Sequence, residues 1–283
     1  MVSLGVVDNR QYPQKSCVIL ITPQIFVRDF YMLLQRLIPT LLLKNKRLVK
    51  GKQYRDFRDA GNPKTTARAH NHQGADELLV LDIEASRYGR APDVDTVRAL
   101  AEECFMPLCV GGGISDLSIA EACMQAGADK LCLTTTALDD PQLISRLARR
   151  LGSQAVVVGI DVGYDAHREV RLFDHRIASF IPNRHPWEWM AHAVALGAGE
   201  IRLMVVDREG TGVGYDLALY QQAKKWVNVP IILEGGAGTL LHLQAAFEAG
   251  VEGVAVGSML VFSDANLVKI KKHMLTHRCR LRE

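Results

Sequence analysis

The chain of 283 residues lacks the features that mark several common classes of protein. No apolar run approaches the roughly 20 residues that a membrane-spanning helix needs, so we expect no membrane association. The net charge of +3 is too small to indicate nucleic-acid binding. The sequence has no CxxC pair, and its one HxH pair, His70 and His72, falls in a helical pattern that we expect to place both side chains on the surface. We therefore expect neither a metal nor a cofactor.

The cysteines lie mainly within apolar runs, as buried free thiols do, at positions 17, 104, 109, 123, 132 and 279. The apolar run CVILIT near the N-terminus is short, is soon interrupted by Pro23 and has no basic segment before it, so it does not predict a signal peptide. Together these observations favour a reducing compartment, and we expect a cytoplasmic protein.

Eight short apolar runs alternate with helical patterns along most of the chain. Each run is apolar through its middle, which is typical of parallel strands covered on both faces. The runs cover residues 37–43, 78–83, 107–111, 130–134, 155–161, 201–207, 230–235 and 252–257, and the helical patterns between them include 94–104, 117–127, 141–152, 186–197, 217–226 and 240–250. This alternation predicts an α/β fold, a single (β/α)8 TIM barrel, with an open doubly wound sheet as the alternative.

The second half of the chain repeats the plan of the first. Asp82 precedes Gly111 by 29 residues, and Asp207 precedes Gly235 by 28. This match favours closure into a barrel built from two similar half-barrels, because an open sheet has edges that a two-fold repeat does not need.

The N-terminal segment falls outside this repeat. Met32 stands directly before the first apolar run, so we interpret residues 1–31 as an N-terminal extension or as the product of an over-long gene start. Residues 32–283 would then form the barrel with a basic C-terminal helix.

Two glycine-rich segments each end a predicted strand and precede a helix: GGG at 111–113 and GGAG at 235–238. Bare glycines let backbone N–H groups approach an anion, and small hydroxyl residues one strand later add donors. Two such clusters on opposite sides of a barrel mouth predict an elongated ligand with a phosphate at each end. The alternative is that these glycines only make tight turns.

Acidic residues end three of the predicted strands. Asp161 closes a very apolar strand and should point into the mouth, where a carboxylate can act as a general acid or base, or can accept a structural hydrogen bond. Asp82 and Asp207 could act in chemistry or cap the next turn. The counterpart of Asp161 in the first half is Leu42, so a site built on paired acids lacks one.

Four charged residues stand at or just before strand starts, at the opposite end of the barrel: Arg36, Glu77, Lys130 and Glu200. Their signs are mixed, and from this spacing alone we expect a neutralised plug for the core.

Several motifs together resemble the cyclase subunit of imidazole glycerol phosphate synthase. They include RLIPTLLLKNKRLVKG, ADELLVLDIEAS, VGGGIS, GSQAVVVGID, GAGEIRLMVVDREGTGVGYD and EGGAG, and the resemblance runs in order from residue 32 to about 262. It implies the (β/α)8 fold, a glutaminase partner at the bottom of the barrel, and ammonia drawn along the barrel axis. At the top, ammonia would react with a bis-phosphate ribosyl substrate to give imidazole glycerol phosphate and an aminoimidazole carboxamide ribotide.

The resemblance also implies roles for residues at matching positions. Asp161 would be a catalytic acid, Asp129 would contact the glutaminase, and the four charges at the bottom would form an ammonia gate rather than a plug. One phosphate site would comprise Gly113, Thr134 and Thr135, and the other Gly210, Gly236, Gly257 and Ser258.

The chain departs from the family pattern at several positions. Leu42 stands where the family has the aspartate expected to drive cyclisation, and leucine cannot move a proton. Glu209 replaces Asp, and Thr134 replaces Asn. Glu234 replaces Ser beside a phosphate site, which adds a negative charge where an anion should bind.

Three functions follow from these similarities and departures. The segment LLLKN resembles paralogues from surface-polysaccharide gene clusters, which work with a glutaminase and a separate amidotransferase-like protein to convert an acetamido sugar to an acetamidino sugar. We favour this interpretation, in which the chain supplies ammonia and binds a phosphorylated small molecule. The alternatives are a true cyclase of histidine biosynthesis and a non-catalytic scaffold that docks a glutaminase.

Overall fold

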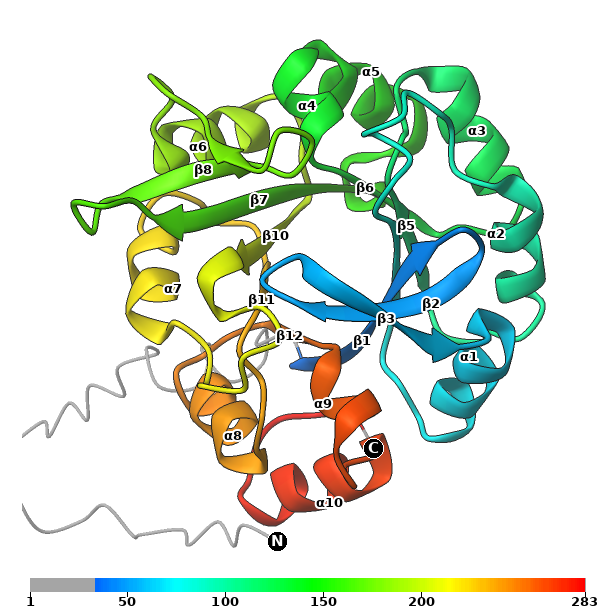
Figure 1. Ribbon diagram of the computed structural model, residues 1–283, viewed down its shortest axis with the longest axis vertical. Coiled ribbons are helices and arrows are strands. Elements are labelled where there is room, and N and C mark those ends of the chain that lie inside the picture. The colour runs from blue at the N-terminus through cyan, green and yellow to red at the C-terminus, as the bar shows by residue number, and fades with distance from the viewer. Residues whose placement is uncertain (1–33, 283) are drawn as a thin grey trace, which may run out of the picture. The chain divides into compact units, whose positions relative to one another are not determined.

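The computed structural model describes residues 34–282, so the prediction of an N-terminal extension over residues 1–31 lies outside the described residues. Eight parallel strands form a ring within the described part of the chain (Figure 1). In order round the ring they are β1 Arg36–Lys44, β4 Leu78–Asp82, β5 Leu108–Gly111, β6 Lys130–Leu133, β7 Val156–Tyr164, β10 Glu200–Val205, β11 Ile231–Glu234 and β12 Gly253–Val256. Because β1 pairs in parallel with both β12 and β4, the ring is closed. The predicted barrel is confirmed, and the open-sheet alternative is wrong.

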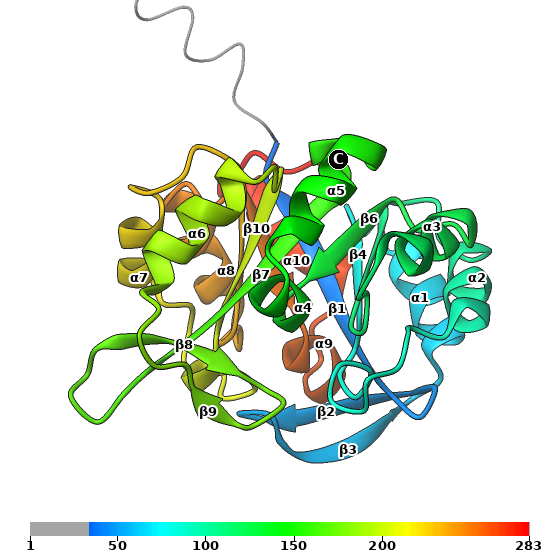
Figure 2. The same ribbon diagram turned by 90° about the horizontal axis from the view of Figure 1, so that it is seen from above.

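Helices cover the outside of the ring (Figures 1 and 2). They are α1 Pro63–His72, α2 Val94–Ala101, α3 Leu117–Gln125, α4 Thr135–Asp139, α5 Gln142–Leu151, α6 Pro186–Ala195, α7 Leu217–Ala223, α8 Leu240–Glu248, α9 Ser258–Phe262 and α10 Leu267–Thr276, with short 3-10 turns at Ser153–Ala155 and Val206–Arg208. None of the helices in the described range is long and apolar enough to cross a membrane.

Short polar side chains fix where several of these helices begin. A carboxylate oxygen of Asp116 accepts a hydrogen bond from the backbone N–H of Ile119 at 3.0 Å, and Asp216 accepts one from Leu219 at 3.1 Å. These bonds satisfy N–H groups that have no partner inside the first helical turn. The two caps start α3 and α7, and so help to define the loops at the barrel mouth.

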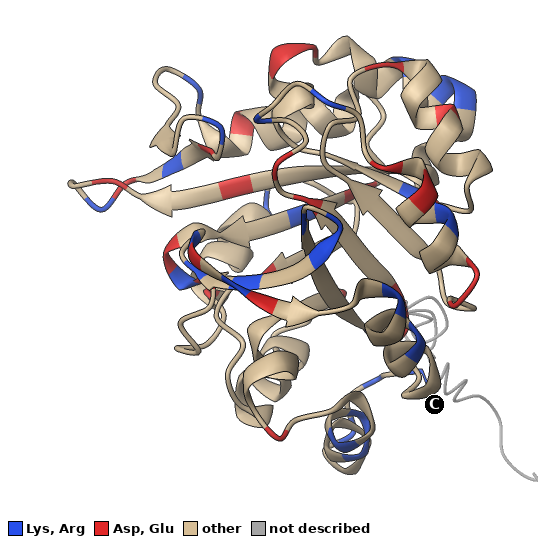
Figure 3. Cartoon of the chain, turned by 45° about the vertical axis from the view of Figure 1, so that its right-hand side comes forward, with Lys and Arg blue, Asp and Glu red and all other residues tan. Residues whose placement is uncertain are grey.

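Two hairpins extend the barrel at the end where its strands finish (Figures 1 and 2). The first consists of β2 Arg47–Lys52 and β3 Arg55–Gly61, and the second of β8 Val170–Asp174 and β9 Ser179–Phe180. Charged residues of both signs lie along β2 and β3 (Figure 3). Because of these charges, a search for apolar runs does not detect the two strands. The two hairpins partly cover the mouth and contribute side chains to it.

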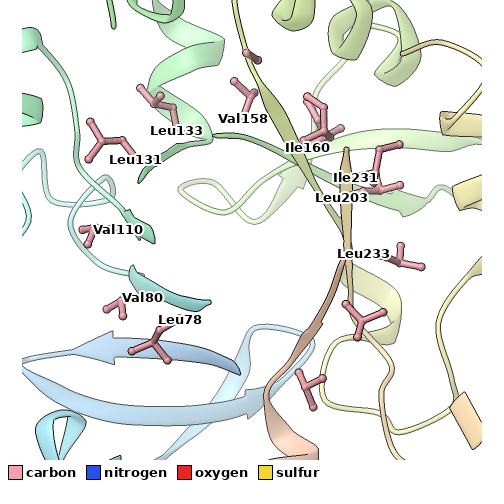
Figure 4. Packing of buried hydrophobic residues seen from close by; sticks show 14 of the residues in the cluster. Leu78, Val80, Val110, Leu131, Leu133, Val158, Ile160, Leu203, Ile231 and Leu233 are labelled. Atoms are coloured by element: carbon pink, nitrogen blue, oxygen red, sulfur yellow. The ribbon is translucent and has the colours of Figure 1, made fainter. Parts of the chain in front are cut away.

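The barrel has an outer and an inner apolar core. The outer core lies between strands and helices and includes residues such as Val80, Val110, Leu133 and Leu203 (Figure 4). The inner core is a separate cluster with one residue from each of seven strands: Ile38, Leu79, Cys109, Cys132, Val157, Ile232 and Ala255, each at most 1% exposed. These seven residues form an apolar layer inside the barrel.

Two expectations about single residue types have different outcomes. Cys109, Cys123 and Cys132 are buried free thiols, as predicted. The surface position expected for His70 is wrong, because its side chain is buried against the barrel. Burial and the nearby Lys50 lower the pKa of His70 to about 4.

Candidate functional site

The barrel mouth contains two neighbouring cavities at the carboxyl ends of the strands, where the chemistry of this fold is found. The larger has a volume of about 130 Å³ and is lined by Leu42, Asp161, Gly112, Gly113 and three consecutive threonines, Thr134 to Thr136, among others. The smaller has a volume of about 20 Å³ and is lined by Leu42, Glu209, Gly210, Glu234, Gly236, Gly257 and Ser258, among others. The residues expected to bind two phosphates are therefore brought together as two groups, one in each cavity.

Asp161 lies on β7 inside the mouth and is 3% exposed. Its Oδ1 accepts a hydrogen bond from Nη1 of Arg202 at 3.0 Å, and its Oδ2 is bound by Nε2 of His175. Burial alone would raise the pKa of Asp161, but the charges and hydrogen bonds of His175 and Arg202 outweigh it and lower that pKa. The carboxylate is thus ionised and engaged on both oxygens.

Three residues at this centre escaped prediction from the sequence: Arg202, His175 and Tyr54. Arg202 lies on β10, is 2% exposed, and donates from Nε to Oε2 of Glu234 at 2.5 Å as well as binding Asp161. An arginine in the middle of the apolar run EIRLMVV was the signal available, because a buried strand seldom carries an unpaired charge. His175 follows β8 in a polar segment that gave no such signal.

The ring of Tyr54 packs on that of His175, with centroids 4.1 Å apart. The Tyr54 hydroxyl and the Nδ1 atom of His175 are both buried and have no hydrogen-bond partner in the described part of the chain. Polar atoms buried without partners are uncommon in proteins, so this wall of the larger cavity has unused hydrogen-bonding capacity beside Asp161.

The first seat, as we call the group Gly112, Gly113, Thr134 and Thr135, belongs to the larger cavity. Gly113 donates its N–H to the hydroxyl of Ser86 at 3.1 Å, and both glycines have positive φ. A Cβ atom on Gly112 would lie 2.1 Å from the carbonyl oxygen of Asp82, so only glycine fits there.

The second seat, Gly210, Gly236, Gly257 and Ser258, belongs to the smaller cavity. A Cβ atom on Gly236 would lie 2.1 Å from the carbonyl oxygen of Gly214, just as one on Gly113 would lie 2.1 Å from the carbonyl oxygen of Arg90. Two buried carboxylates, Glu209 and Glu234, stand beside this seat. The buried ammonium of Lys50 lies over Gly257 and donates to the carbonyl oxygen of Thr40 at 2.7 Å.

Asp82 and Asp207 have structural partners. Asp82 accepts hydrogen bonds from the N–H groups of Glu84 and Ala85, both at 3.1 Å, and forms a two-pronged ion pair with Arg90 at 2.6 and 2.9 Å. Asp207 accepts from the N–H of Tyr164 at 2.7 Å. These contacts are the ones expected if Asp82 and Asp207 cap turns or orient loops.

The four charges at the opposite end of the barrel form one ion-pair ring. Arg36 binds Glu77 at 2.7 Å and also binds Glu200, while Lys130 binds Glu77 at 2.7 Å and Glu200 at 2.8 Å. Burial, followed by Glu200, raises the pKa of Glu77, whereas Arg36 and Lys130 outweigh burial at Glu200 and lower its pKa. Asp129, next to Lys130, is exposed at the same end and accepts from the N–H of Leu108 at 2.8 Å.

Within residues 34–282, no three His, Cys, Asp or Glu side chains are grouped so that they could hold a metal ion. The buried charged groups of the mouth, such as Asp161, Arg202, Glu234 and Lys50, are instead paired with one another or with backbone groups.

Comparison of the sequence with known proteins assigns the chain to a family. The family model described as "Histidine biosynthesis protein" matches residues 36–266. The chain belongs to the histidine biosynthesis protein family. It is 43% identical over 228 residues to the imidazole glycerol phosphate synthase subunit HisF of Exiguobacterium sibiricum, which covers 81% of this chain and 91% of that relative.

Other relatives carry the same name. The HisF subunit of Anoxybacillus flavithermus is 41% identical over 250 residues, covering 86% of this chain and 97% of the relative. That of Chloroherpeton thalassium is 40% identical over 248 residues, covering 87% and 98%. The family resemblance inferred from the motifs is thereby confirmed.

Proposed function

We propose that this chain is a synthase-type subunit that receives ammonia from a glutaminase and supplies it for the amidination of an acetamido sugar in surface-polysaccharide biosynthesis. The observation that carries this proposal is the composition of the larger cavity, which Leu42 and Asp161 both line. Closing an imidazole ring requires proton transfers by positioned groups. Leucine offers none, and both oxygens of Asp161 are already bound.

The ammonia route is retained in this proposal. The ring of Arg36, Glu77, Lys130 and Glu200 would act as the gate, and the exposed Asp129 beside it would contact the glutaminase. The apolar inner layer above the ring favours passage of neutral ammonia over ammonium, because an apolar environment disfavours a charge.

In this proposal Asp161 contributes to catalysis by positioning His175. A buried carboxylate that binds one nitrogen of an imidazole fixes the ring and stabilises its protonated form. Amidination joins the ammonia nitrogen to the amide carbon and expels the amide oxygen as water. The unpartnered Nδ1 of His175 would accept one of the two protons that the nitrogen gives up and return it to the departing oxygen. The first seat, with Gly113, Thr134 and Thr135, would hold a phosphoryl group of the ligand.

The experiment is a reconstitution of this chain with its glutaminase, the amidotransferase-like protein, glutamine and the acetamido sugar. We expect mass spectrometry to detect replacement of one oxygen by NH, and we expect that conversion to fall when Asp161→Asn replaces the wild type. Equal conversion in the absence of the chain would refute the proposal.

The second candidate is a cyclase of histidine biosynthesis. The identity of 38–43% to HisF subunits and the family model favour it. The two candidates differ in one measurable property, which is turnover of the ribosyl bis-phosphate with ammonia.

A further inference from the structure

We propose that the ligand of this mouth carries a single phosphoryl group, which binds the first seat, and that the second seat excludes phosphate. This inference rests on the proposed function and deepens it, because it defines the class of ligand as a monophosphate. A family member that works on a ribosyl bis-phosphate would need both seats.

The sizes of the two cavities support the assignment. The cavity of the second seat, at about 20 Å³, has room for about one water molecule. The cavity of the first seat, at about 130 Å³, is several times larger and opens along the three threonines and two glycines. The side chain of Lys50 also lies close to Gly257, since a Cβ atom on Gly257 would lie only 2.5 Å from Nζ of Lys50.

The charges near the second seat oppose an anion. Glu209 and Glu234 are each 5% exposed and line the cavity. The two nearby cations are Lys50, which donates to a backbone carbonyl, and Arg202, which Glu234 shares with Asp161. Both cations are therefore already engaged, and a buried dianion added beside Glu209 and Glu234 would find no free cation to compensate its charge.

Matching the positions of the two halves identifies Glu234 as the residue most responsible for excluding phosphate from the second seat. When Gly113 is matched to Gly236, counting back two residues pairs Gly111 with Glu234. The first seat has no side chain where the second has a carboxylate.

The acidic residues near the first seat are compensated. Arg90 and two backbone N–H groups neutralise Asp82, and Arg202 and His175 bind Asp161. Two further arginines line the cavity: Arg176, whose guanidinium is bound by Asp139 and Asp174, and the exposed Arg87.

The test is calorimetric titration of the full chain with inorganic phosphate. We expect one phosphate per chain. Thr135→Val, which removes a hydroxyl without changing side-chain size, should weaken binding at least about tenfold, because a lost hydrogen bond to a charged group has this magnitude. Ser258→Ala in the second seat should leave binding unchanged.

A double variant tests whether the two carboxylates exclude phosphate from the second seat. Glu209→Gln with Glu234→Gln removes two negative charges with little change of shape, and we expect the folded double variant to bind a second phosphate. Glu248→Gln, at an exposed position of α8, is the matched control and should bind one. If the double variant does not fold, the Thr135→Val and Ser258→Ala pair still decides the assignment.

Several results would overturn the inference. They are two phosphates per wild-type chain, no phosphate at all, a single phosphate lost in Ser258→Ala, or a folded double variant that gains none. These results are distinct from failure of the proposed function. Amidination of the sugar that proceeds equally well without the chain, while the chain still binds one inorganic phosphate at the first seat, would defeat the proposed function alone.

Discussion

The first and second seats share one backbone plan and differ in the side chains around it. Gly112 and Gly113 have φ values of 95° and 78°, and Gly235 and Gly236 have values of 99° and 105°. Around this shared turn, the first seat has threonines and an open cavity, whereas the second has two carboxylates and a lysine. A repeated turn therefore identifies where a ligand could bind, but the neighbouring side chains decide which charge the place accepts.

The same contrast extends below the seats. Leu79 on β4 and Arg202 on β10 occupy matching positions, two residues after Glu77 and Glu200 respectively. Leu79 is part of the inner apolar layer, while Arg202 ties together Asp161 and Glu234. The four predictions below test this difference between the halves, beginning with the largest expected effect.

Arg202→Leu would make the second half resemble the first at this level. We expect the free energy of unfolding to fall by about 3–5 kcal/mol, because removal of the cation leaves Glu234 as a buried, uncompensated carboxylate. Urea unfolding would measure this change. Arg98→Leu, which breaks an exposed pair with Asp95, is the control and should cost less than about 1 kcal/mol. A loss at position 202 as small as that of the control would show that the ion pairs are not holding the mouth together.

Leu42→Asp combined with Glu234→Ser would restore the family's residues at two of the four altered positions. We expect turnover of the ribosyl bis-phosphate with ammonium to rise at least about a hundredfold above the wild-type background, the lower end of what a positioned acid–base group contributes. Each single variant should give much less, because one leaves the second seat closed and the other leaves the acid missing. Absence of any gain in a folded double variant would mean that Arg202 or another departure also blocks cyclisation.

The pH dependence of stability tests whether burial in the second seat destabilises the ammonium of Lys50. Burial, partly offset by Glu234 and Glu209, lowers the pKa of Lys50 from 10.5 to about 8. Between these two values the unfolded chain binds more protons than the folded chain, so stability should rise with pH across that window. The unfolding free energy of the wild type should therefore increase relative to Lys50→Met from pH 8 to 10.5. A flat difference across this range would show that the ammonium is not penalised by burial.

Asp82→Asn and Asp207→Asn form a matched pair from the two halves. Each should lower the free energy of unfolding by about 1 kcal/mol, the usual contribution of a hydrogen bond. Neither should weaken phosphate binding, because Asp82 and Asp207 are bound to loop groups and supply no donor to an anion. A loss of phosphate binding in either variant, measured by calorimetry, would place that aspartate in the binding site.

The fold could be predicted from the sequence because each barrel strand is a short apolar run, and most of these runs end near a glycine or an acid. The hairpins of β2 with β3 and β8 with β9 could not, since charged residues interrupt them and they cover the mouth instead of entering the core. Their absence from the prediction also hid Tyr54 and His175.

The site could be predicted in part. The seats and the four-charge ring follow from residues that stand at strand ends. The partners of Asp161 do not, because Arg202 reaches it from the neighbouring strand β10 and His175 from the loop that follows β8. The position of Lys50 beside Gly257 likewise depends on how β2 folds back over the mouth.

The most direct test of the central claim is to incubate the purified chain with the ribosyl bis-phosphate and excess ammonium salt at mildly alkaline pH, without any glutaminase. Loss of substrate would be followed on a preparation shown to be folded. The account predicts no turnover above background, because Leu42 replaces an acid and the second seat is closed. Turnover at an enzyme-like rate would contradict it and make the chain a cyclase of histidine biosynthesis.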